Sequence, residues 1–209
     1  DLGPIHGILF DLGISALQLE DRERGFSFRH DAPLDMRFSP EQDLTAADII
    51  NGFPEEVLAE ILHKYGEERK ARQIARRIAE SRPLMRTGAL GRVVEQVIGH
   101  QRRIHAATRT FQALRIAVNE ELESLELALK QAVSILKFSG RLVVISFHSL
   151  EDRLVKRCFA RYARSGFEHG DERMEFELIY KKPLTAGDRE VRMNPRARSA
   201  KLRAIRRVR

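Results

Sequence analysis

Between residues 142 and 147 five of six positions are apolar, and only Ser146 interrupts them. A short run of this kind predicts a strand that is buried on both faces. Residues 5–10 have the same character, and polar groups follow each run directly, at 11–15 and at 148–152. Because ligands of open α/β sheets bind beyond the carboxyl ends of the strands, this pattern predicts one shared site. The alternative is two core strands whose ends are merely solvated.

Between these two runs the apolar residues recur every three or four positions, which is typical of amphipathic helices. Thr45 and Asp48 have the spacing of a capping box, and Thr87 is expected to cap a later helix. Uninterrupted helices over residues 45–100 predict a small all-helical unit inserted into an α/β domain. The helices are predicted to begin at Thr45, Pro54, Glu67 and Thr87.

The longest predicted helix covers residues 108–136, where apolar positions keep a three-to-four spacing over seven turns. Ser139 and Gly140 are expected to end it and to lead into the strand at 142–147. A helix, a tight glycine turn and a buried strand form an αβ unit of a parallel sheet.

The last part of the chain predicts a helix to about Arg164 and then two strands, at 176–180 and 200–204. The two strands leave no room for a crossover helix, so we expect an antiparallel pair. Alternating apolar and basic residues from Ala200 to Ala204 predict a basic edge strand with one buried face.

Charge is concentrated near the end of the chain. The net charge is +7, and residues 191–209 hold eight Lys or Arg residues and no acid. Such a cluster is typical of proteins with polyanionic partners, and the alternative is a solvated tail. A second basic run, residues 69–77, is most simply a solvated helix face, with nucleic-acid contact as the alternative.

Several classes of chemistry lack their motifs. The His residues show no HxH or HExxH spacing and there is no CxxC, so no metal site is expected. No GxSxG elbow, phosphate-binding P-loop or GxGxxG turn occurs. Cys158 is the single cysteine, which fits a reducing cytoplasm, and no apolar run approaches the roughly 20 residues that span a membrane.

A set of longer blocks resembles one family closely. The blocks occur in the family's order and cover essentially the whole chain. They resemble the bacterial 16S ribosomal RNA cytosine-N4 methyltransferases, which use S-adenosylmethionine. They are residues 11–19 (DLGISALQL), 24–28 (RGFSF), 33–37 (PLDMR), 65–68 (YGEE), 108–116 (TRTFQALRI), 146–153 (SFHSLEDR) and 194–203 (NPRARSAKLR).

The resemblance implies an α/β fold, a class I (Rossmann-like) methyltransferase sheet with an inserted all-helical domain. Residues 1–40 and 106–209 would form the methyltransferase core, and 41–105 a substrate-recognition domain. The family's glycine-rich cofactor loop has no counterpart in this sequence, so we expect the chain to lack the family's first third. It departs from the family at Ala16, Ala106 and Phe138-Ser139, all at turns.

The resemblance also implies a reaction, in which S-adenosylmethionine methylates the exocyclic N4 amine of a cytosine in the decoding region of the small subunit. No protein nucleophile is needed. The expected partner is 16S ribosomal RNA or the small ribosomal subunit in the cytoplasm, and a homodimer stays open. The rival interpretation is a non-catalytic RNA-binding or assembly module.

Candidate site residues follow from the matched blocks. Asp11 and Gln18 match cofactor-contacting positions, with an N-cap and a surface amide as the alternatives. Residues expected to act at the target base form a catalytic group, for which a structural hydrogen-bonding role is the alternative. Basic residues form an RNA-binding group. The catalytic group is Ser146, His148, Ser149 and Asp35; the RNA-binding group is Arg37, Arg196, Arg198, Lys201 and Arg203.

Overall fold

The computed structural model describes residues 5–99, 106–170 and 172–209. The chain divides into two compact units, each described separately below: residues 1–13 with 122–209, and residues 14–121. The helical insertion predicted at 41–105 lies within the second unit, which is longer at both ends. No helix in the described ranges is long and apolar enough to cross a membrane.

The first unit is built on a mixed sheet. Its parallel pair lies at one side of the sheet and joins β1 (Ile5–Asp11) to β2 (Leu136–Ser146), with Leu9 opposite Val143. β7 (Lys201–Arg207) runs antiparallel to β2, and β5 (Phe176–Leu178) and β6 (Leu184–Thr185) run antiparallel to β7. The predicted parallel pair, the predicted antiparallel pair and the α/β class are therefore confirmed.

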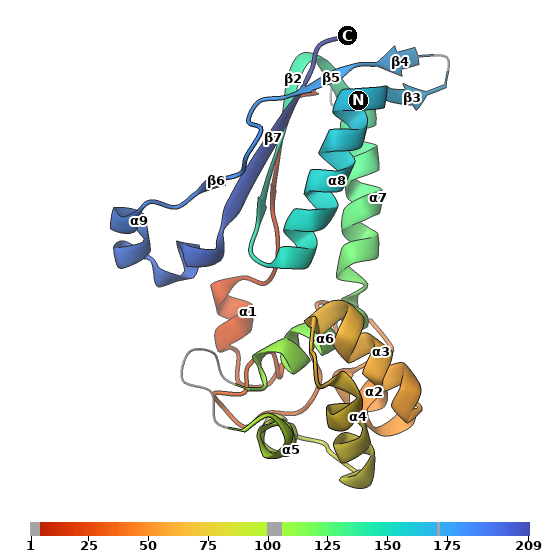
Figure 1. Ribbon diagram of the computed structural model, residues 1–209, viewed down its shortest axis with the longest axis vertical. Coiled ribbons are helices and arrows are strands. Elements are labelled where there is room, and N and C mark those ends of the chain that lie inside the picture. The colour runs from red at the N-terminus through yellow and green to blue at the C-terminus, as the bar shows by residue number, and fades with distance from the viewer. Residues whose placement is uncertain (1–4, 100–105, 171) are drawn as a thin grey trace. The chain divides into compact units, whose positions relative to one another are not determined.

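Two helices, α7 (Glu121–Ile135) and α8 (Ser149–Ser165), lie side by side along one face of this sheet (Figure 1). Leu129 of α7 and Phe159 of α8 pack with Leu142 of β2 in one apolar core. The remaining elements of this unit are β3 (Phe167–His169), β4 (Glu172–Met174), α9 (Asp188–Met193) and the 3-10 helix η1 (Pro195–Ser199).

The prediction of a basic edge strand at 200–204 is wrong, because β7 lies inside the sheet. Ile205 is opposite Leu142 of β2 on one side and Leu178 of β5 on the other. An interior strand can carry charges here because several of them are neutralised within the unit. Arg206 pairs with Glu177, for example, with 2.9 Å between Nε and Oε1.

The single helix predicted at 108–136 is also wrong. It is interrupted at Glu120, which has a left-handed φ of 48° between α6 (Thr108–Asn119) and α7. Within the second unit the Asn119 amide donates to Met36 O at 2.8 Å and accepts from the Phe38 N–H at 2.6 Å. These side-chain bonds tie the end of α6 to a loop far away in sequence, and apolar spacing carries no sign of them.

Ser139 and Gly140 do not end the helix, which stops at Ile135; they lie within β2. The backbone of β2 is irregular there: Ser139 has a φ of 62°, and the β1–β2 register shifts between Ile5 and Gly7. A Cβ at Gly140 would lie 2.7 Å from Lys137 O, so the close approach of the backbone requires glycine.

The second unit is helical. The capping box of Thr45 and Asp48 is confirmed, but Thr87 does not cap the next helix: the N-cap position is Arg86, whose side chain makes no capping hydrogen bond. The Thr87 hydroxyl is taken by the preceding loop, since it accepts from the Ala32 N–H and donates to His30 O, both at 2.9 Å. Besides α6, the unit contains α1 (Ala16–Glu20), α2 (Ala46–Gly52), α3 (Glu55–Gly66), α4 (Ala71–Glu80) and α5 (Thr87–Ile98).

Candidate active site

The carboxyl ends of the two parallel strands lie at one edge of the sheet. Asp11 ends β1 opposite Ile145, and the Leu12 N–H donates to Ile145 O at 3.0 Å. A Cβ at Gly13 would lie 3.9 Å from Glu151 Oε1, so the chain leaving β1 passes close to the first turn of α8. Within this unit, the polar residues after β1 and those after β2 therefore share one edge, as the two apolar runs predicted.

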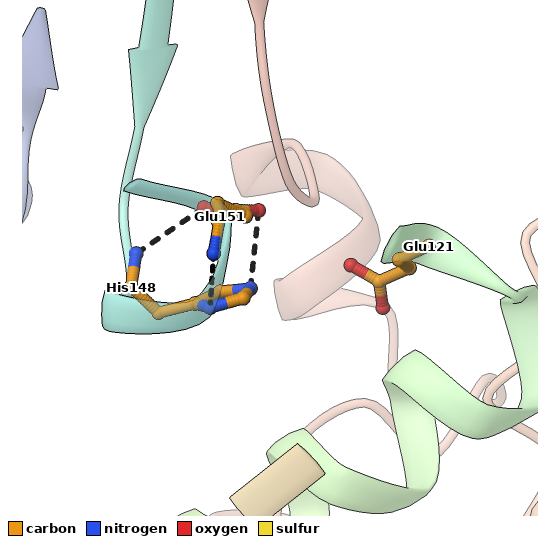
Figure 2. Close-up of side chains that lie close together, drawn as sticks. All are labelled: Glu121, His148 and Glu151. Carbon is orange, nitrogen blue, oxygen red and sulfur yellow. Dashed lines mark hydrogen bonds and ion pairs between the residues drawn. The ribbon is translucent and has the colours of Figure 1, made fainter. Parts of the chain in front are cut away.

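The first turn of α8 is closed by His148 and Glu151 (Figure 2). Nδ1 of His148, the N-cap residue, accepts from the Glu151 N–H at 3.4 Å. In return, Glu151 Oε2 accepts from the His148 and Phe147 N–H groups at 3.2 and 2.8 Å. Glu121, drawn in the same figure, belongs to the other compact unit, where it accepts from Arg115 Nε at 2.7 Å.

The second nitrogen of the His148 ring also faces Glu151. Nε2 lies 3.1 Å from Oε1, in a close contact whose alignment is poor for a hydrogen bond. Burial opposes ionisation of Glu151, but His148 and the two backbone N–H groups outweigh it and hold the pKa of the carboxyl below its usual range. Because Nδ1 is taken by the Glu151 N–H, His148 in this geometry is a helix cap.

The two serines expected beside His148 have different surroundings. Ser146 is 2% exposed, and its hydroxyl donates to Lys201 O at a long 3.4 Å. Ser149, the first residue of α8, is exposed. Of the two hydroxyls, that of Ser149 is the one that a ligand at this edge can reach.

Asp152 makes contacts that the sequence motifs did not predict. Its carboxylate accepts from Arg203 Nε at 2.7 Å and from Lys201 Nζ at 3.0 Å, which ties α8 to β7. Burial opposes ionisation of Asp152, but the two cations hold the pKa of its carboxyl below the usual range. The side chain of Arg203 is only 12% exposed, whereas that of Lys201 is 40% exposed.

Asp35 and Arg37 lie in the helical unit and bind each other. Arg37 Nε and Nη2 donate to the Asp35 carboxylate at 2.9 and 2.8 Å, and Nη1 donates to Gln42 O at 2.6 Å. The hydrogen bond and charge of Arg37 lower the pKa of the Asp35 carboxyl despite partial burial. In this geometry the pair closes the loop at 35–42.

The remaining predicted residues are more exposed or serve local structure. Gln18 completes a capping box at α1: its Oε1 accepts from the Ser15 N–H at 3.0 Å. Arg196 and Arg198 are exposed on η1. Asp11 is exposed at the end of β1, and its carboxylate makes no hydrogen bond or ion pair with another residue of the described ranges.

A mixed sheet covered by two helices, with polar groups at the carboxyl ends of its parallel strands, is a Rossmann-like arrangement. The chain belongs to the MraW methylase family, which it matches over residues 1–208. This agrees with the family resemblance of the sequence blocks.

Relatives with high identity carry one name, Ribosomal RNA small subunit methyltransferase H. The protein from Dehalococcoides mccartyi is 54% identical over 98% of this chain, and the chain spans 61% of its length. The Synechocystis protein is 54% identical over 94% of this chain, which covers 62% of it. The protein from Heliobacterium modesticaldum is 51% identical over 99% of this chain, which covers 70% of it.

Proposed function

We propose that the whole protein methylates the exocyclic N4 amine of a cytosine in the decoding region of 16S ribosomal RNA, with S-adenosylmethionine as methyl donor. The observation that carries this proposal is family membership over residues 1–208. High identity to proteins named as ribosomal RNA small subunit methyltransferases supports the substrate class. The proposed location is the cytoplasm.

Asp11 is the residue in this chain that best fits the cofactor. An exposed carboxylate at the carboxyl end of a parallel strand can accept hydrogen bonds from amine or hydroxyl groups of a ligand. Gln18 keeps its amide donors for a ligand, since its oxygen is used at the α1 cap. When bound, S-adenosylmethionine supplies an electrophilic methyl group on a sulfonium.

At the target base, Ser149 is proposed to accept a hydrogen bond from the amine and hold it in line for attack. The cytosine amine is a weak nucleophile because its lone pair is delocalised, so orientation supplies much of the rate. We propose that His148 and Ser146 shape the turn that presents Ser149. Asp35 would act through the loop that it closes with Arg37.

RNA binding is proposed to use Arg196, Arg198 and Lys201, which are exposed or partly exposed. Arg37 and Arg203 would support RNA binding by holding the protein backbone around these residues in place, because their guanidinium groups already bind carboxylates. The target cytosine has to be unpaired or flipped, since base pairing buries its amine. Residues 41–105 are proposed as the domain that recognises the RNA substrate. A homodimer is a separate proposal, which sedimentation can test.

The test is transfer of tritium from labelled S-adenosylmethionine to small ribosomal subunits that lack the modification, with the full-length protein. We expect incorporation at one cytosine, and a rate about 100-fold lower for Ser149→Ala. A protein that binds the subunits but transfers no label would overturn the enzymatic proposal and favour the assembly module. Asp11→Asn should weaken cofactor binding in calorimetry and leave RNA affinity unchanged.

A further inference from the structure

One face of α8 carries a row of exposed basic side chains, here called the basic stripe. Each member has another member three or four residues away, so they share one side of the helix. The opposite side of α8 is buried and packs Val155, Cys158 and Phe159 into the core. The basic stripe consists of Arg153, Lys156, Arg157, Arg161 and Arg164.

The acids of α8 do not neutralise this stripe. Glu151 and Asp152 are both buried, and they bind the helix cap and β7 respectively. The basic face of α4 differs, because Arg76 and Arg77 both pair with Glu80 on the same helix.

One acid of the neighbouring helix lies near the stripe. Arg161 lies against the Tyr162 ring, 5.3 Å from its centroid. The Tyr162 side chain and, more weakly, the carboxylate of Glu126 on α7 raise the pKa of the Arg161 guanidinium. Lys156, Arg157 and Arg164 make no hydrogen bond or ion pair with another residue that the structure describes.

Stability of the helix does not explain this arrangement. Arg153 with Arg157, and Arg157 with Arg161, are like-charge pairs four residues apart, and such pairs destabilise a helix. Arg164 alone gains from its place in the last turn, where the helix dipole favours cations. A self-repelling row in which Lys156, Arg157 and Arg164 have no partner among the described residues is suited to an external polyanion.

We propose that the basic stripe binds the phosphate backbone of the RNA strand that carries the target base. This inference rests on the proposed function, which places that base beside Ser149 at the start of α8. From Arg153 to Arg164 the stripe extends about 17 Å away from that end, at 1.5 Å per residue. A strand entering the site can therefore follow α8 outward, with its phosphates against successive turns.

The test compares two full-length variants that each lose three positive charges. Lys156→Gln with Arg157→Gln and Arg164→Gln removes the cations of the stripe that have no described partner. Lys130→Gln with Lys137→Gln and Arg141→Gln is the matched control, at exposed positions for which no RNA contact is proposed. The readouts are affinity for a 16S RNA fragment across a salt series, cofactor binding, and the thermal midpoint of each variant.

We expect the stripe variant to bind RNA about tenfold more weakly and to lower the log–log salt slope by about 2. Its cofactor affinity and folding should equal those of the unmodified protein, and its thermal midpoint should not fall. An equal loss in the control would mean that only bulk charge matters and would overturn the proposal. Unchanged RNA affinity together with lost binding to phosphatidylglycerol vesicles would overturn it in favour of a membrane surface.

Failure of the proposed function would look different. If the unmodified protein transfers no methyl group to the subunits but the stripe variant still loses RNA affinity, the stripe stands and the enzymatic proposal falls. If methyl transfer is intact and the stripe variant keeps both its RNA affinity and its salt slope, the proposal for the basic stripe is refuted and the enzymatic proposal remains.

Discussion

His148 and Glu151 cap each other across the first turn of α8: the Glu151 N–H donates to His148 Nδ1, and the His148 N–H donates to Glu151 Oε2. A histidine beside carboxylates at the end of a strand suggests acid–base chemistry. In this protein the same three-residue spacing that brings the groups together also matches a capping box. We therefore assign any catalytic role at this edge, as a proposal, to groups that the turn presents, such as Ser149.

Replacing His148 separates its capping role from any chemical role. His148→Ala should lower the free energy of unfolding by about 1 kcal/mol, because one N–H at the helix start loses its acceptor. His148→Asn keeps a side-chain acceptor and should recover most of that loss. Urea unfolding measures both. If methyl transfer by the full-length protein is recovered in the Asn variant, the imidazole is a cap; loss in both variants would assign it a part in the reaction.

Glu151 should make stability depend on pH. Its pKa is lower in the folded protein than its ordinary 4.5, so its contribution is present above that value and disappears as the pH falls through the folded-state pKa. Glu151→Gln should cost about 1–3 kcal/mol at neutral pH and flatten the acid limb of the stability curve. Glu60→Gln, at an exposed position of α3, is the control. An acid limb unchanged in Glu151→Gln would contradict the assignment.

Asp152 is expected to be the most sensitive polar position of the sheet unit. Asp152→Asn leaves the Arg203 guanidinium, 12% exposed, without its carboxylate, and should cost about 3 kcal/mol. Lys201→Gln should cost less than about 1 kcal/mol, because the Lys201 side chain is 40% exposed. Chemical denaturation of both variants gives the comparison, and equal costs would mean that Arg203 is not held by this pair.

Two glycines of the helical unit should respond in opposite directions to alanine. A Cβ at Gly66 would lie 2.7 Å from Arg109 O, so Gly66→Ala should push α3 away from α6 and lower the free energy of unfolding by about 1–3 kcal/mol. At Gly91 no atom lies within 4 Å of the added Cβ, so Gly91→Ala should stabilise α5 by up to about 1 kcal/mol. Thermal midpoints of the two variants test the pair, and a shift of the same sign in both would refute it.

Local pattern predicts much of this fold, and its failures have physical causes. The apolar runs at 5–10 and 142–147 correctly predict the parallel pair. The expected burial on both faces is wrong, because no residue of β1 is buried and Leu9 is 63% exposed. The break at Glu120 leaves no such mark, since apolar residues continue with helical spacing on both sides of it. Its visible cause is Asn119, whose amide binds a loop more than 80 positions earlier in the chain.

In the candidate site, too, local sequence predicts some features and misses contacts between distant residues. Family blocks locate residues 146–153 and 194–203, but they do not reveal that Asp152 binds Lys201 and Arg203. That contact joins residues about 50 positions apart and depends on the register of β7 against β2. Basic residues of β7 therefore look available in the sequence and are partly neutralised in the fold. The basic stripe of α8 shows the opposite effect. Its charges are not balanced by Glu151 and Asp152, because these acids are buried and bind other groups.

The interior position of β7 has a consequence for synthesis. Leu142 of β2 pairs with Ile205 of β7, so 63 further residues have to be synthesised before this side of β2 can pair. At roughly 5–20 residues per second, the ribosome leaves that apolar edge open for about 3–13 s. During this interval the nascent chain offers an unpaired strand to other chains, and chaperone capture or slow-codon effects should be strongest between the synthesis of β2 and of β7.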